Sequence, residues 1–128
     1  MNPEELQYTE EHEWVGREGG VHVIGITDFA QQQLGDITYV ELPEVGRSVE
    51  QNEDTAVVES VKAASDVYAP AAGRVCAVNE ALESTPELVN QDPYGQGWFF
   101  KLEGVDPGQL GGLMDAAAYR KFLEDIEG

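Results

Sequence analysis

The chain has 128 residues, 41% of them hydrophobic, and a formal net charge of -18 at pH 7. This length suits one ordinary domain whose core needs no disulfide or metal to hold it together. Its 25 acidic residues against seven basic ones would be repelled by phosphate backbones and by anionic membrane surfaces. We therefore expect neither nucleic acid nor a membrane as a partner. The charge serves either docking to basic partner faces or solubility alone.

Cys76 is the only cysteine, so no disulfide can form within the chain. It lies in the apolar run 75–78, which predicts a small buried side chain and not a reactive thiol. The sequence has no apolar run long enough to span a membrane, and its acidic start lacks the features of a secretion or transit signal. We expect a cytoplasmic protein, with a mature organellar form as the alternative.

Short runs of β-branched and aromatic residues between turn-forming residues predict a mainly β chain. Strands are expected, in chain order, at 8–15, 21–26, 37–42, 55–61, about 67–68, 74–78 and 97–102. A short helix is expected at 28–34, where Thr27 or Asp28 can cap the first turn and Gly35 can end the last. A further helical turn is expected within 83–90.

The end of the chain changes from strand to helix periodicity. Four large apolar side chains recur at the spacing of one helical face, and Asp115 is a suitable N-cap for that helix. They are Tyr119, Phe122, Leu123 and Ile126. We expect this apolar stripe to pack on the sheet. A helix that binds a partner is the alternative.

An internal repeat suggests how the strands are arranged. Segment 40–47 matches segment 67–74 at four of eight positions, including the shared Pro-x-x-Gly-Arg. Proline and glycine restrict turns in specific ways, so the repeat predicts one turn made twice and two quasi-symmetric halves. With short helices and a C-terminal helix, this favours a flattened β-barrel or sandwich. We expect a single domain over 1–128, with its core at about 8–103 and a helical segment at about 107–127.

Lys62 lies between two predicted strands, so it is expected at the tip of a hairpin. The small residues at 63–65 would leave its amine open to an approaching enzyme. Lysines that act as nucleophiles are buried or placed beside another cation, whereas Glu59 and Asp66 are the charged neighbours here. Catalysis by Lys62 itself is therefore disfavoured. A solvated charge and a modified lysine both remain open.

Other catalytic or metal motifs are missing from the sequence. His12 and His22 have no cysteine or third histidine at a suitable spacing to complete a metal site. We also find no glycine-rich phosphate loop, nucleophile elbow or calcium-binding loop. The chain is therefore not expected to be an enzyme.

Seven blocks, in order along nearly the whole chain, resemble the glycine cleavage H protein family. The block at 58–63, with the letters VESVKA, resembles the segment that is lipoylated in that family. The other six are at 8–15 (YTEEHEWV), 24–36 (beginning IGITDFA), 40–46 (VELPEVG), 78–82 (VNEAL), 86–90 (PELVN) and 92–98 (beginning DPYG).

The flanks of Lys62 separate this family from related carriers. Biotin carriers usually place methionines beside their lysine, whereas this chain has Val61 and Ala63. Lipoyl domains of 2-oxoacid dehydrogenases often have Asp before the lysine, and lack the His-Glu-Trp and Asp-Pro-Tyr-Gly blocks. Those complexes also tether the domain through flexible linkers, and no such linker is present here.

The resemblance implies a lipoyl/biotinyl-type fold with lipoic acid attached covalently to Lys62. The lipoyl group would carry the aminomethyl group of glycine from the pyridoxal-phosphate-dependent decarboxylase (P protein) to the aminomethyltransferase (T protein). Dihydrolipoyl dehydrogenase (L protein) would then reoxidise it, and a lipoylating enzyme would install it. The carrier itself, expected to be a monomer, would supply position and shelter. Relay of lipoate to other enzymes and a non-catalytic scaffold role are the alternatives.

The resemblance also assigns roles to five other residues. Glu13 and Asp66 are candidates for a cleft in which the lipoyl arm docks, and Gln33 replaces a cleft residue that is His in some relatives. Glu59 and Gly46 match positions used in recognition by the lipoylating enzyme. The alternative is that Glu59 only faces solvent and that Gly46 only makes a turn.

The chain departs from the family at Asn52, where relatives often have glycine. Asparagine tolerates the left-handed backbone region better than most residues, so we expect the turn to be kept.

Overall fold

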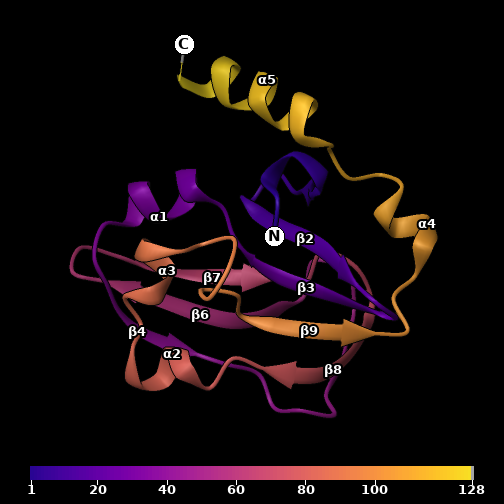
Figure 1. Ribbon diagram of the computed structural model, residues 1–128, viewed down its shortest axis with the longest axis horizontal. Coiled ribbons are helices and arrows are strands. Elements are labelled where there is room, and N and C mark those ends of the chain that lie inside the picture. Colours follow the sequence, from indigo (N-terminus) through magenta and orange to yellow (C-terminus); the bar gives the residue numbers. More distant parts are fainter. Residues whose placement is uncertain (128) are drawn as a thin grey trace.

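The structure is a computed structural model that describes residues 1–127. Its strands form two antiparallel sheets, of order β1-β2-β3-β9-β8-β5 and β4-β6-β7 (Figure 1). The strands are β1 (Gln7–Tyr8), β2 (Glu13–Glu18), β3 (Val21–Ile26), β4 (Ile37–Glu41), β5 (Ser48–Val49), β6 (Asp54–Ser60), β7 (Ala64–Tyr68), β8 (Gly73–Val78) and β9 (Phe100–Glu103). The expected mainly β architecture is confirmed.

Short helices connect the strands or extend from them. They are the 3-10 helix η1 (Pro3–Glu5) and the α-helices α1 (Asp28–Leu34), α2 (Ala81–Ser84), α3 (Leu88–Gln91), α4 (Pro107–Leu110) and α5 (Ala116–Glu127). Helix α1 is capped as predicted, because the Thr27 hydroxyl accepts a hydrogen bond from the Ala30 N–H at 3.2 Å and Gly35 follows with φ +82°. Within residues 1–127, no helix has the length and apolar character needed to cross a membrane.

The core lies between the two sheets, because alternate residues of each strand point inward. Ile24, Phe100 and Leu102 of the larger sheet pack in one buried cluster with Val58 and Val67 of the smaller sheet. All five side chains are at most 1% exposed. Packing therefore occupies the inner faces of both sheets. Residues that bind or react must lie on the edges, turns and outer faces.

The strand predicted at 8–15 is wrong, because the chain turns in its middle. β1 ends at Tyr8, and β2 begins at Glu13 and continues to Glu18, beyond the predicted end. Between them His12 takes the left-handed conformation, with φ +69°. Its ring lies against Phe29 of α1, with ring centroids 4.8 Å apart, and its Nδ1 is 2.9 Å from the Tyr119 hydroxyl. Contacts distant in sequence therefore replace the regular strand with a turn.

The repeat does not make the same turn twice, so that prediction is also wrong. Gly46 has φ +99°, whereas Gly73 starts the extended strand β8. The end of the first copy instead pairs with the residue that follows the second: the Gly46 N–H donates to the Val75 carbonyl at 2.7 Å, and the Val75 N–H donates to the Arg47 carbonyl at 2.8 Å. The left-handed turn expected at Asn52 is confirmed by its φ of +67°.

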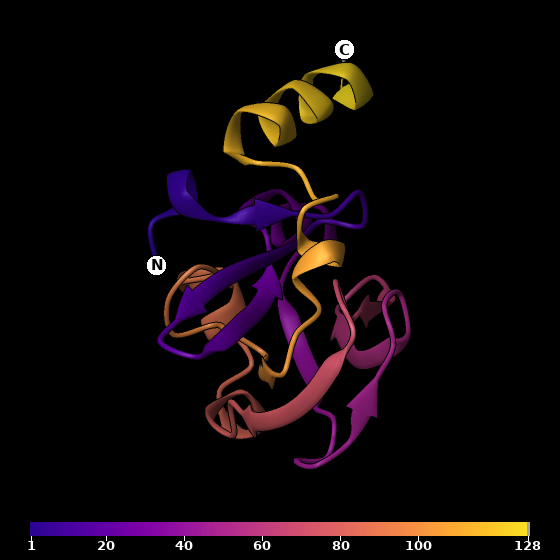
Figure 2. The same cartoon turned by 90° about the vertical axis from the view of Figure 1, so that its right-hand side faces the viewer.

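Helix α5 lies at the periphery of the molecule, above η1 and β1 (Figures 1 and 2). Asp115 caps it as predicted, accepting a hydrogen bond from the Ala118 N–H at 2.8 Å. Tyr119 is 4% exposed and stacks on Tyr8 with ring centroids 4.4 Å apart, but Ile126 is 51% exposed. Phe122 and Leu123 are half-buried against the same cluster as Tyr119, so the apolar stripe packs on the edge of the larger sheet as expected, with Ile126 left exposed at its end.

Candidate functional site

Lys62 is exposed at the tip of the hairpin that joins β6 to β7. The last register pair of these strands is Glu59 with Ala64, so only four residues make the turn. The Ser60 N–H donates to the Ala63 carbonyl at 2.8 Å, and the Ser60 hydroxyl accepts from the N–H groups of Ala63 and Lys62 at 3.1 and 3.3 Å. The backbone at Lys62 is thus held in place while its side chain remains free.

The stem of Lys62 lies over the backbone that follows α1. A Cβ added to Gly35 would stand 3.1 Å from Lys62 Cε and 3.9 Å from Nζ, closer to Cε than side chains normally pack. The Val61 N–H, on the other side of the turn, donates to the Asp36 carbonyl at 3.1 Å. This second role of Gly35 and the part of Ser60 in the turn were not among the sequence-based predictions. A serine two residues before the lysine was the available signal for the turn.

The two residues assigned to recognition lie apart, with Glu59 on the smaller sheet and Gly46 in the loop that leads from it to the larger sheet. Glu59 is half-buried on β6, next to the Lys62 turn, where it pairs with Tyr39 of β4. β4 then runs away from that turn and leads into the loop that contains the exposed Gly46. The structure therefore places Glu59 beside Lys62 and Gly46 about one strand length away.

Glu13 is buried, with a relative exposure of 2%, and it ties β2 to β7. Its carboxylate accepts hydrogen bonds from the Thr9 hydroxyl at 2.6 Å and from the Tyr68 N–H at 3.2 Å. Burial disfavours the charged form and raises the pKa of Glu13 to about 7, although both hydrogen bonds act in the opposite direction. Glu13 is therefore poised to change protonation near neutral pH.

Asp66 and Gln33, unlike Glu13, are exposed. Asp66 lies on β7 opposite Val57 and lines an open hollow of about 440 Å³ on the smaller sheet. Gln33 lies on α1, two residues before Gly35, over which the Lys62 stem lies. The oxygens of Glu13 bond to Thr9 and Tyr68, so the three cleft candidates are not joined to one another.

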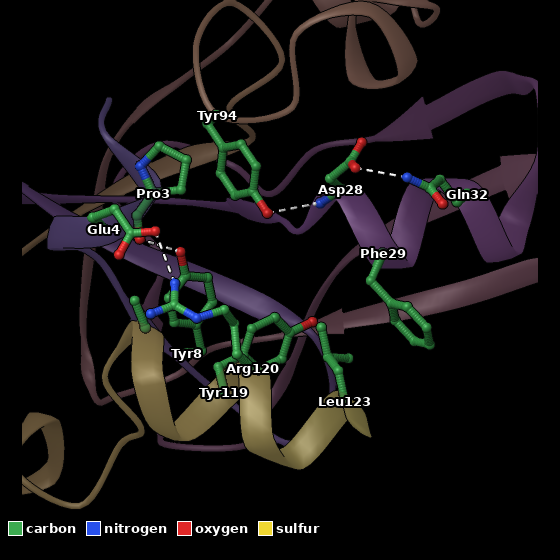
Figure 3. A pocket seen from close by; sticks show the side chains of 11 residues that line it. Pro3, Glu4, Tyr8, Asp28, Phe29, Gln32, Tyr94, Tyr119, Arg120 and Leu123 are labelled. Atoms are coloured by element: carbon green, nitrogen blue, oxygen red, sulfur yellow. Dashed lines mark hydrogen bonds and ion pairs between the residues drawn. The ribbon is translucent and has the colours of Figure 1, made fainter. Parts of the chain in front are cut away.

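A second hollow, of about 300 Å³, lies where η1, α1 and α5 meet (Figure 3). Its polar groups bond to one another: the Asp28 N–H donates to the Tyr94 hydroxyl at 3.0 Å, and the Arg120 guanidinium pairs with Glu4 at 2.8 Å. It lies at the start of α1, whereas Lys62 contacts the residue after the end of α1. We regard this hollow as part of the contact that holds α5.

Comparison with known proteins matches residues 6–126 to the family described as "Glycine cleavage H-protein". The glycine cleavage system H protein of Symbiobacterium thermophilum is 58% identical over 123 residues, which cover 96% of each chain. The glycine cleavage system H protein of Thermus thermophilus is 60% identical over 122 residues, which cover 95% of each chain. A crystal structure of a glycine cleavage system H protein from Mycobacterium marinum superposes with a TM-score of 0.86 at 35% identity. The match covers 96% of this chain and 99% of that one.

Proposed function

Because this chain belongs to the glycine cleavage H-protein family, we propose that Lys62 is the lysine that carries its lipoyl group. The protein is the lipoyl carrier of the glycine cleavage system, and it works with the P, T and L proteins without being a catalyst. When bound, the lipoyl group supplies reversible disulfide chemistry. The chain's own task is to present the group, move it and shield it.

The exposed position of Lys62, on a hairpin tip held by hydrogen bonds to Ser60, is the observation that carries this proposal. Joining lipoate to a lysine through an amide removes the positive charge, so a lysine held in an ion pair would lose that pair on modification. Among residues 1–127 the ion pairs involve four other basic side chains, so modification of Lys62 breaks none of them. They are Arg47, Arg74, Lys101 and Arg120.

We further propose that the arm docks along the surface between Lys62 and Glu13. Gln33 on α1 and Asp66 on β7 would be its exposed polar contacts, and Glu13 would lie at the buried end. Both oxygens of Glu13 have partners within the fold, so a docked group must share or displace one of them. A neutral amide at Gln33 can donate and accept hydrogen bonds without changing charge.

We assign recognition by the lipoylating enzyme to Glu59 and Gly46, and we place the protein in the cytoplasm. Glu59 is three residues from Lys62 on the same strand-to-turn segment, within the footprint of any enzyme that reaches the amine. The φ of +99° at Gly46 favours glycine, which supports a shape requirement there. The bacterial sources of the similar H proteins support the location.

The assignment of Lys62 is tested by peptide mapping of protein purified from cells that lipoylate their proteins. We expect the mass of one lipoyl group on the peptide that contains Lys62. Lys62→Arg should fold normally, remain unmodified and fail to support glycine decarboxylation with the purified P protein. Lys121→Arg is the matched control, because Lys121 is also exposed but lies on α5, away from the hairpin. This variant should behave as the wild type. A lipoyl group found on another lysine would refute the proposal.

A further inference from the structure

The outer face of the smaller sheet is exposed at several positions. Val40, Val58 and Val67 point into the core and are 1–2% exposed, so their neighbours along each strand point outward. Register pairs place the outward side chains of the three strands side by side. We call this set the outer face: Tyr39, Glu41, Val57, Glu59, Ala64 and Asp66.

Large apolar side chains are exposed on this face and at its Lys62 end. Tyr39 is 51% exposed, and Val61, which directly precedes Lys62, is 69% exposed. Val57 lies on the same face of β6 as Glu59, half-buried in the floor of the 440 Å³ hollow. Tyr39 and Val61 are therefore accessible to a protein that approaches Lys62.

The rim of this face is strongly acidic. Glu41 and Glu59 lie on it, and Glu44 and Asp54 line the hollow at its far end. The basic residue that lines this hollow, Arg47, already pairs with Glu53 at 2.8 Å. A partner that covers the face must therefore bring basic side chains around an apolar centre.

We propose that the outer face is the docking surface for the lipoylating enzyme; this inference rests on the proposed function of Lys62. Before modification, the amine extends from the hairpin only by the length of a lysine side chain. The enzyme that modifies it must therefore contact the surface next to the hairpin. Enzymes that act after modification meet a much longer arm and can bind farther away. The face also extends from Glu59 to the loop that contains Gly46, so one partner can contact both residues.

The dimensions of the face suit a transient contact. The five residues from 57 to 61, at the end of β6 and the start of the turn, span about 13 Å at the rise of a β-strand. Three strands add a width of about 10 Å. This is far smaller than the roughly 800 Å² that each partner buries in a stable complex. A small face with one aromatic anchor fits an enzyme that must release its product after each modification.

The test measures lipoylation of the unmodified full-length protein by its purified lipoylating enzyme, with intact mass as the readout. Tyr39→Ala should raise the KM for the protein about tenfold and change kcat less than twofold, because an anchor of binding is lost without moving the amine. Glu41→Gln combined with Glu44→Gln should weaken the dependence of KM on salt. Ile126→Ala, at the same exposure as Tyr39, and Glu124→Gln are the matched controls on α5 and should leave KM unchanged.

Further measurements separate the possible failures. Equal thermal unfolding midpoints would exclude a folding defect in the variants. A wild-type KM in Tyr39→Ala, with the lipoyl group mapped to Lys62, would overturn the docking surface alone. A lipoyl group on another lysine would overturn the function of Lys62 as well. A defect seen only when pre-lipoylated Tyr39→Ala is assayed with the P protein would show that the face serves that enzyme instead.

Discussion

Replacing Glu13 with glutamine should make the protein more stable than the wild type above neutral pH and change it little near pH 5. The carboxyl group is 2% exposed, and burial raises its pKa from the ordinary 4.5 to about 7. The folded state therefore holds a proton that the unfolded state has already released between these two values. The stability that the protonated form contributes is complete below pH 4.5 and is lost as the pH rises through 7.

The size of the effect follows from the two pKa values. Each tenfold difference in proton affinity corresponds to about 1.4 kcal/mol, so the interval from 4.5 to about 7 amounts to about 3 kcal/mol. Glutamine keeps an oxygen that can accept from the Tyr68 N–H, and its NH₂ group can donate to the Thr9 hydroxyl. The variant should therefore retain the link between β2 and β7 without a group that titrates.

Urea unfolding of both proteins from pH 5 to pH 8.5 measures the difference directly. The free energy of unfolding of Glu13→Gln minus that of the wild type should grow by about 2.5 kcal/mol across this range, since part of the interval lies below pH 5. Burial lowers the pKa of His12, so His12 takes stability away as the pH falls, but it is present in both proteins and cancels. Glu10→Gln, an exposed change in the same turn, should follow the wild type. If the free energies of unfolding of Glu13→Gln and the wild type changed in parallel with pH, the reasoning would be refuted.

Two further predictions concern the contacts around α1. Tyr119→Phe removes the hydroxyl that lies 2.8 Å from the Thr27 hydroxyl and 2.9 Å from His12 Nδ1. It should lower the free energy of unfolding in urea by about 1–3 kcal/mol, because the buried Thr27 hydroxyl and the half-buried His12 each lose this hydrogen-bond partner. A Tyr119→Phe protein as stable as the wild type would show that water replaces the hydroxyl. Gly35→Ala should cost about 1–3 kcal/mol, since φ is +82°, a conformation that alanine rarely adopts. Thermal unfolding measures this loss, and an unchanged midpoint would contradict it.

The features that could be predicted from the sequence are those that a few neighbouring residues decide. Thr27 caps α1 and Gly35 ends it because a hydroxyl at the start and a residue with φ above zero at the end are local requirements. Asp115 caps α5 for the same reason. Lys62 occupies the tip of a hairpin because apolar runs of strand length flank it on both sides.

The features that were missed depend on residues far apart in the chain. Nothing near His12 indicates a left-handed turn, because its partner Tyr119 is 107 positions away. The burial of Glu13 depends likewise on Tyr68, 55 positions away. A carboxylate in an acidic stretch normally faces water, so the local pattern argues against the position that the fold gives it.

Two requirements on a carrier lysine oppose each other, and the structure of the Lys62 turn meets both. An enzyme that modifies Lys62 binds more tightly if the turn is already ordered, and the Ser60 hydroxyl and the Asp36 carbonyl hold it in that state. An arm that must visit several active sites works best if its own protein does not hold it, since every internal contact lowers its effective concentration at a partner. Gly35 has no side chain with which to grip the stem of Lys62. The backbone is therefore fixed and the side chain is not, which is the division that a swinging arm requires.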